Sequence, residues 1–179
     1  MQPRIAPAEP PYAEPIAAAL AKIMPPGVPP LALFRILARN ERVFSRLMAG
    51  GLLDRGSLTI RERELVIDRT CVRCGSSYEL GVHLAFYAPK AALTAAEIRE
   101  LRADVLTLGV FAPREALLLR MCDELHATST IGEALWTELA AAYREDQLVE
   151  LVALAGYYHA ISFVTNAFRI PPEPFATSR

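Results

Sequence analysis

An imidazole and two carboxyl groups are the side chains of this sequence whose types and spacing favour proton-transfer chemistry. Glu79 and His83 are four residues apart in a segment, 76–88, that is predicted to be helical, so they share one helix face and can hydrogen-bond. A carboxylate beside an imidazole fixes the orientation of the ring, and such a pair can act as general acid and base. The alternative is an ordinary ion pair on a solvated helix. The apolar residues around the pair favour a buried position instead.

Glu64 is the second carboxyl group in an unusual position. On the predicted helix 60–74 it falls on a stripe whose other members are Ile60, Ile67, Cys71 and Cys74. A carboxylate on such a face needs a partner, or its pKa rises. The plainer interpretation is a helix-edge ion pair with Arg61 or Arg63.

These residues form a candidate catalytic site. We predict that His83 is the general acid or base, that Glu79 orients it, and that Glu64 is a second carboxylate handling protons. Ser76 and Tyr78, on the same predicted helix as His83, are predicted to bind substrate.

Cys71 and Cys74 form a C-x-x-C pair, which is a candidate redox dithiol. Their position at the end of a predicted helix argues against that role, because a helix C-terminus raises the pKa of a thiol. Two cysteines three residues apart on a regular helix are also poorly placed for a disulfide. Arg73 could stabilise a thiolate, or the negative charge that develops in a decarboxylation. Structural thiols are the favoured interpretation, and a dithiol is the alternative.

The sequence gives little indication of a metal site. There is no second C-x-x-C, and the histidines are His83, His126 and His159. His126 is predicted at a helix C-terminus, where a positive charge is favoured, and His159 is predicted to be a core residue of an apolar helix. Cys122 lies among apolar residues and is predicted to be a core thiol. We therefore predict no metal and no cofactor.

The predicted elements are all helical. Helices are expected near 14–24, 31–40, 60–74, 76–88, 95–103, 113–127, 132–142 and 145–168, with a further one that Asn40 caps and that ends near Gly50. Capping boxes are expected at Thr59–Glu62, Thr94–Glu97 and Thr130–Glu133. No segment alternates with period two. The sequence thus predicts an all-α fold, with an extended N-terminal arm over 1–15 and a single helical domain over 16–179.

Composition excludes several classes of function. The 179 residues carry a net charge of −1 and no run of Lys and Arg, so nucleic acid is not an expected partner. The apolar stretches are interrupted by polar residues, which predicts no membrane-spanning segment and no membrane partner. The N-terminus lacks the pattern of a signal peptide, and three cysteines do not form a secreted disulfide framework, so a cytoplasmic location is expected.

Two stretches resemble the carboxymuconolactone decarboxylase-like and alkylhydroperoxidase D-like superfamily. They are Arg61-Glu62-Arg63-Glu64-Leu65-Val66-Ile67 and Gly75-Ser76-Ser77-Tyr78-Glu79-Leu80-Gly81-Val82-His83. The resemblance implies a helical bundle and a homo-oligomer, often a trimer or hexamer, with a dimer possible. It also implies a small-molecule site in a cleft between helices, near a subunit interface.

Two chemistries are known in this superfamily. The alkylhydroperoxidase branch reduces peroxides with a C-x-x-C dithiol assisted by Glu and His, and the decarboxylase branch acts without cofactor and without that dithiol. Counted from Glu64, the two peroxidase cysteines correspond to Ser76 and Glu79, and the histidine corresponds to His83. A serine cannot form a sulfenic acid or a disulfide.

The resemblance therefore favours a lyase or decarboxylase acting on a small organic acid. Two alternatives remain: a thiol-dependent peroxidase with antioxidant activity that uses Cys71 and Cys74, and a helical oligomer without enzymatic activity.

Overall fold

The chain is built from helices joined by short loops. The computed structural model describes residues 3–25 and 27–176, and these contain no β-strand. The helices are α1 (Glu14–Ile23), α2 (Ala32–Leu37), α3 (Glu41–Ala49), α4 (Ile60–Arg73), α5 (Ser77–Tyr87), α6 (Ala95–Leu101), α7 (Pro113–Thr128), α8 (Glu133–Ala142) and α9 (Glu145–Ala167), followed by the short 3-10 helix η1 (Pro174–Ala176). The all-α prediction is confirmed. The largest difference in helix ends is at α2, which stops at Leu37 rather than near residue 40.

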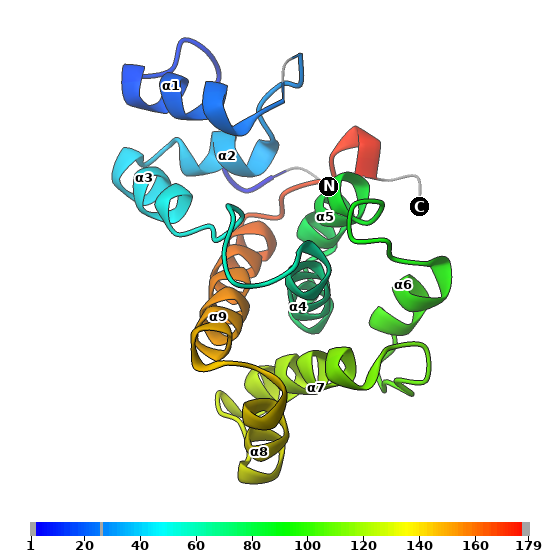
Figure 1. Cartoon of the computed structure of the whole chain (residues 1–179). Coiled ribbons are helices and arrows are strands. Elements are labelled where there is room, and N and C mark those ends of the chain that lie inside the picture. Colours follow the sequence, from blue (N-terminus) through cyan, green and yellow to red (C-terminus); the bar gives the residue numbers. More distant parts are fainter. Residues whose placement is uncertain (1–2, 26, 177–179) are drawn as a thin grey trace.

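The central helix is α4. It packs against α5, α6, α7 and α9, while α1–α3 lie at one end of the molecule and α8 at the other (Figure 1). All ten residues from Glu62 to Cys71 are buried, although half of them are charged. Buried charges need partners, so the polar contacts of α4 decide how its neighbours are placed.

Local signals explain where several helices begin and end. The Asn40 side chain caps α3, and Thr59 and Thr94 form the predicted capping boxes of α4 and α6. Gly75, with a φ of +64°, ends α4 and allows α5 to start in a new direction. The box predicted at Thr130 is wrong. The cap of α8 is Gly132, whose backbone N–H donates to the Glu124 carboxylate of α7 at 2.8 Å.

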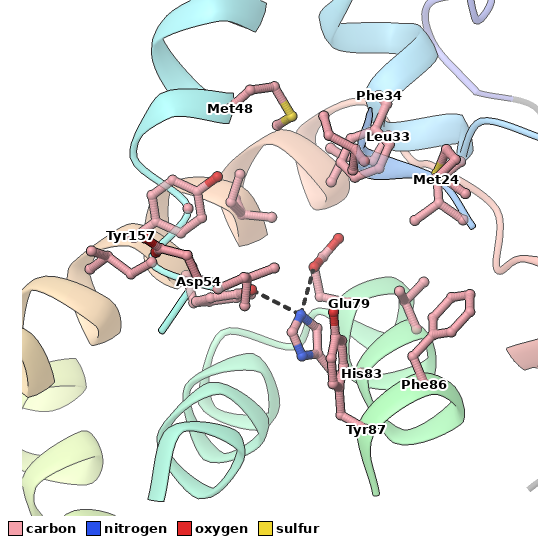
Figure 2. A pocket seen from close by; sticks show the side chains of 18 of the residues that line it. Met24, Leu33, Phe34, Met48, Asp54, Glu79, His83, Phe86, Tyr87 and Tyr157 are labelled. Atoms are coloured by element: carbon pink, nitrogen blue, oxygen red, sulfur yellow. Dashed lines mark hydrogen bonds and ion pairs between the residues drawn. The ribbon is translucent and has the colours of Figure 1, made fainter. Parts of the chain in front are cut away.

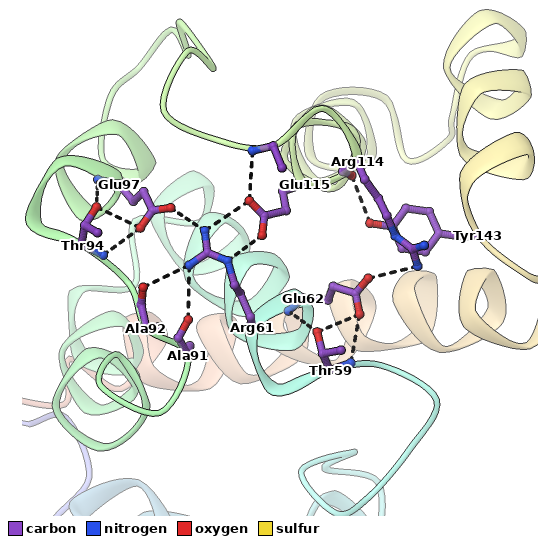
Figure 3. Close-up of polar contacts among 11 residues, drawn as sticks. Thr59, Arg61, Glu62, Ala91, Ala92, Thr94, Glu97, Arg114, Glu115 and Tyr143 are labelled. Carbon is purple, nitrogen blue, oxygen red and sulfur yellow. Dashed lines mark hydrogen bonds and ion pairs between the residues drawn. The ribbon is translucent and has the colours of Figure 1, made fainter.

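Arg61 ties α4 to two other helices. Its guanidinium donates to Glu115 of α7 and Glu97 of α6, and to the carbonyls of Ala91 and Ala92 (Figure 3). Two turns further along α4, Arg69 is fully buried. It donates to both carboxylate oxygens of Asp123 at 2.7 and 2.8 Å and to the carbonyl of Leu101.

Apolar packing completes the frame around the site. The largest core cluster joins α4, α7, α8 and α9, for example through Ile67, Leu118 and Leu151. A second cluster fixes α1–α3 to α5 and α9 through Phe44, Val82 and other buried residues. The N-terminal helices thus form a wall opposite the face of α5 that carries Glu79 and His83.

Within the predicted N-terminal arm 1–15, residues 3–13 contain no helix and are held against the body of the protein, whereas Glu14 and Pro15 already belong to α1. The Arg4 backbone N–H donates to the Phe168 carbonyl at 2.9 Å, and the Ala8 backbone N–H donates to the Arg35 carbonyl at 2.9 Å. Arg39 of the α2–α3 turn donates to the Ala6 carbonyl at 3.0 Å.

Among the described residues, α9 is the one helix that is long and apolar enough to cross a membrane. Length and composition are weak evidence, because the core helix of a globular fold passes the same test. α9 packs against α4, α5 and α8, and Leu151, Leu154 and Tyr158 belong to the main core.

Candidate active site

His83 lies where three helices meet. Its Nδ1 is 2.7 Å from Glu64 Oε2 of α4, and its Nε2 is 2.9 Å from the Tyr158 hydroxyl of α9. Glu79, one turn earlier on α5, has its Oε2 3.8 Å from the same Nε2 (Figure 2). All four side chains are nearly fully buried. The structure therefore brings together His83, Glu79 and Glu64, which were predicted from two separate helices.

The roles of the two carboxyl groups differ from the prediction. Glu64, and not Glu79, orients the ring, because Glu64 makes the short contact to Nδ1. Arg63 donates to the other oxygen of Glu64, Oε1, at 3.1 Å and so fixes the orientation of the carboxylate. Glu79 stands on the Nε2 side at a distance too long for a hydrogen bond. Its Oε1 is buried and has no hydrogen-bond partner.

Electrostatics favour protonated groups on the Nε2 side of the ring. Burial acts to lower the pKa of His83, but the hydrogen bond that the ring donates to Glu64 and the negative charges of Glu64, Glu79 and Asp68 outweigh it and raise that pKa. Burial raises the pKa of Glu79, and the His83 charge only partly opposes it. Burial also keeps the Tyr158 hydroxyl protonated, since it raises that pKa well above the usual value. The direction of each shift favours the protonated form of His83, of Glu79 and of Tyr158.

These groups face a cavity of about 500 Å³. His83, Glu79 and Tyr158 contribute to its lining, which is otherwise mostly apolar and comes from α1–α3, α5 and α9; examples are Met24, Phe34, Met48, Val82 and Ile161 (Figure 2). A cavity of this size and composition is typical of a site for a small organic molecule.

A few further polar groups lie on the cavity wall. Lys90, which lines the cavity, places its ammonium 4.9 Å from the centre of the Tyr87 ring, and that ring stacks on His83 with centroids 5.3 Å apart. Asp54 lines it from the α3–α4 loop, and Arg63 holds this loop through the Leu53 carbonyl at 2.8 Å. Among the described lining residues, Lys90 is thus the one lysine or arginine, beside the imidazole of His83.

Ser76 and Tyr78, predicted to bind substrate, are not among the residues that line this cavity. The Ser76 hydroxyl is fully buried and lies 2.8 Å from that of Thr165. The Tyr78 hydroxyl donates to Glu173 at 2.6 Å and accepts from the Leu33 backbone N–H. Both side chains join α5 to other segments.

The two thiols and Arg73 also lie outside the cavity. Cys71 is fully buried, and burial raises its pKa well above the usual value. Cys74 is partly buried, which raises its pKa as well. Arg73 does not face the site: its Nε is 3.5 Å from Asp123. These positions disfavour both a reactive dithiol and a part for Arg73 in binding the charge that develops on substrate.

Sequence reasoning missed three residues of the site. Asp68 is one turn after Glu64 on α4, so helical spacing could have found it. Tyr158 and Lys90 come from other segments, and no local pattern connects them with His83.

Comparison with known proteins supports this description. Residues 40–121 match the Carboxymuconolactone decarboxylase family. No curated protein sequence matches the chain significantly.

Solved structures share the fold over nearly the whole chain. A peroxidase-related protein from Silicibacter sp. TM1040 has a TM-score of 0.83 at 14% identity, covering 100% of this chain and 98% of its own. An alkylhydroperoxidase AhpD core protein from Ralstonia eutropha JMP134 has a TM-score of 0.78 at 19% identity, covering 98% and 95%. A variant of the debrominase Bmp8, in complex with 2,3,4-tribromopyrrole, has a TM-score of 0.71 at 12% identity, again covering 98% and 95%.

At these identities the structural similarity establishes the fold and not the activity. The chain therefore has the fold of these proteins, and its residues 40–121, which include Glu64 and His83, match the Carboxymuconolactone decarboxylase family.

Proposed function

We propose that this protein is a cofactor-independent acid–base enzyme of the lyase or decarboxylase type, acting on a small, largely apolar organic acid. The observation that carries the proposal is the position of His83. One ring nitrogen is fixed by Glu64, and the other is directed to the cavity side beside Glu79 and Tyr158. This is the arrangement that a general acid requires.

The proposed reaction replaces a carboxylate with a proton. The C–COO⁻ bond breaks, carbon dioxide leaves, and the electron pair moves to a neighbouring carbonyl as an enolate. Protonated His83 then transfers the Nε2 proton to the substrate carbon, and water restores it. The Tyr158 hydroxyl donates a hydrogen bond to the enolate oxygen, and Glu79, whose pKa burial raises, donates a second one in its protonated form.

The lining of the cavity supports the choice of substrate class. Its walls are mainly aliphatic and aromatic, so they favour a ring or chain of low polarity. The Lys90 ammonium offers an ion-pair partner for a substrate carboxylate. A volume of about 500 Å³ limits the ligand to a small molecule.

The test is a screen of small lactone, β-keto and enol acids for release of carbon dioxide. Wild-type protein is expected to turn over at least one of them, and His83→Gln is expected to abolish turnover while circular dichroism stays unchanged. Tyr158→Phe should lower kcat by about tenfold or more. Tyr143→Phe is the matched control, because its hydroxyl donates to the Arg114 carbonyl away from the cavity. Retained turnover in His83→Gln would refute the proposal.

A thiol-dependent peroxidase has less support, since Cys71 is buried and both thiols lie outside the cavity. A peroxide-consumption assay separates the two activities. Wild-type protein and Cys71→Ser are expected to have the same low rate. A rate that falls in Cys71→Ser would favour the peroxidase.

The remaining proposals concern organisation and location: a single domain over 16–179 that acts in the cytoplasm and assembles with copies of itself. An exposed apolar stripe along α9 supports assembly, with Val149 72% and Phe163 67% exposed. Light scattering on wild type and on a Val149→Lys, Phe163→Lys double variant tests this. Dissociation is expected only in the double variant. Val105→Lys, at a loop residue that is 82% exposed, is the control.

A further inference from the structure

Outside the cavity, three potential metal ligands converge from three helices. Cys74 is the C-cap that follows α4, His126 is in the last turn of α7, and His159 is in α9. Cys74 Sγ is 3.8 Å from His126 Nδ1, and His126 Nδ1 is 3.2 Å from His159 Nε2. All three donor atoms lie within 4.8 Å of one another. We propose that Cys74, His126 and His159 bind a zinc ion.

The spacing fits tetrahedral coordination. Typical bonds are about 2.0–2.1 Å for Zn–N and about 2.3 Å for Zn–S. At tetrahedral angles two nitrogen ligands then lie about 3.3 Å apart, and a nitrogen and a sulfur about 3.6 Å apart. The observed distances of 3.2 and 3.8 Å are within a few tenths of an ångström of these values, and the remaining pair, Cys74 Sγ and His159, lies within 4.8 Å and has to close by side-chain rotation.

A second contact prepares His159 as a ligand. Its Nδ1 is 2.9 Å from the Ala155 carbonyl on the same helix, and only a protonated Nδ1 can make that hydrogen bond. The proton is therefore on Nδ1, and the lone pair of Nε2 points at His126 and Cys74. Such a hydrogen bond from the other ring nitrogen to a carbonyl is the usual outer support of a metal-binding histidine.

The surroundings hold the thiol ligand in place and balance the local charge. The Asn166 side chain donates to the Cys74 carbonyl at 2.8 Å, which fixes the end of α4 against α9. Asp123 pairs with Arg69 at 2.7 Å and with Arg73 at 3.5 Å, and it so offsets part of the positive charge near the three ligands. One thiolate and two imidazoles suit zinc better than magnesium or calcium, which prefer oxygen ligands.

The proposed site has room for a fourth ligand. His126 is exposed, and Cys74 and His159 are partly buried, so solvent reaches this side of the group. Three protein ligands with an open fourth position are typical of zinc sites that bind water or a substrate. The site is independent of the proposed acid–base chemistry, because none of the three residues lines the cavity.

Cobalt is a suitable spectroscopic probe because tetrahedral Co²⁺ reports its ligands directly. Full-length protein, stripped with a chelator, is titrated with Co²⁺ and then with Zn²⁺. We expect one Co²⁺ per chain, with a thiolate-to-cobalt charge-transfer band and strong visible bands that Zn²⁺ removes. Cys74→Ser should lose the charge-transfer band, and His159→Ala should weaken binding at least about tenfold.

Cys122→Ser is the matched control, since this thiol is buried and donates to the Val66 carbonyl. It should bind Co²⁺ as wild type does, and circular dichroism checks that each variant is folded. The proposal is overturned if wild-type protein binds no Co²⁺, if its spectrum lacks the thiolate band, or if Cys74→Ser and His159→Ala bind Co²⁺ unchanged.

Discussion

Replacing Glu64 with Gln tests whether this carboxylate sets the proton affinity of His83. Glu64→Gln keeps the size of the side chain and removes its charge from the 2.7 Å contact with Nδ1. A hydrogen bond to a charged group contributes about 1.5–3 kcal/mol, and one pKa unit corresponds to about 1.4 kcal/mol. The pKa of His83 should therefore fall by about one to two units. Glu79→Gln should have a smaller effect, because Glu79 is 3.8 Å from the ring.

The assay is an NMR titration of the imidazole nitrogens, with the three histidines assigned by His126→Gln and His159→Gln. Glu62→Gln is the matched control. Glu62 is a buried carboxylate on the same helix, accepts from the Thr59 backbone N–H at the start of α4, and does not contact His83. A His83 pKa that is the same in Glu64→Gln and wild type would refute the reasoning.

The same change predicts how stability depends on pH. The pKa of His83 is higher in the folded protein than in the unfolded chain. Its protonation therefore stabilises the fold below about pH 6.5, and this contribution is lost as the pH rises through the folded pKa. Denaturation of Glu64→Gln and wild type at several pH values should give the larger difference in unfolding free energy at the acidic end of this range.

Three further predictions concern the frame around the site. Arg61→Lys should lower the free energy of unfolding by about 1–3 kcal/mol in urea denaturation, because a lysine, unlike a guanidinium, cannot bind Glu97 of α6 and Glu115 of α7 at the same time. Arg120→Lys, at the exposed ion pair with Glu138, should lower it by less than about 1 kcal/mol. Burial raises the pKa of Asp68 to about 8, so the unfolding free energy of wild type should fall between about pH 4 and pH 8, and that of Asp68→Asn should fall less. An equal loss of unfolding free energy between about pH 5 and pH 8.5 in the two proteins would contradict this. In metal-free native protein a thiol reagent should modify Cys74 before Cys71, which reacts only on unfolding, and a fast reaction at Cys71 would contradict its burial.

The helices could be predicted because their signals are local. Asn40, Thr59 and Thr94 cap the helices they were expected to cap, and Gly75 ends α4 with a left-handed residue. The box at Thr130 failed because α8 begins after Gly132, whose N–H donates to the Glu124 carboxylate of another helix. A capping motif does not reveal such a tertiary partner.

The site could be predicted only in part. The two carboxyl groups and His83 were found because helical spacing and family resemblance both pointed to them. Spacing along one helix favoured the i, i+4 pair, however, while the packing of α4 on α5 gives the closer contact to Glu64. Tyr158 and the ligands of the proposed zinc site depend on how distant helices pack, which no local pattern encodes.

The central claim is that His83 Nε2 meets a substrate acid inside the cavity. A crystal structure of the protein soaked with a small, unreactive aromatic carboxylate tests it most directly. The account predicts that the ligand lies in the cavity, with its ring against the apolar wall, its carboxylate near Lys90 and one edge in contact with His83 and Glu79. A ligand that binds elsewhere, while the protein's own side chains fill the cavity, would contradict the account.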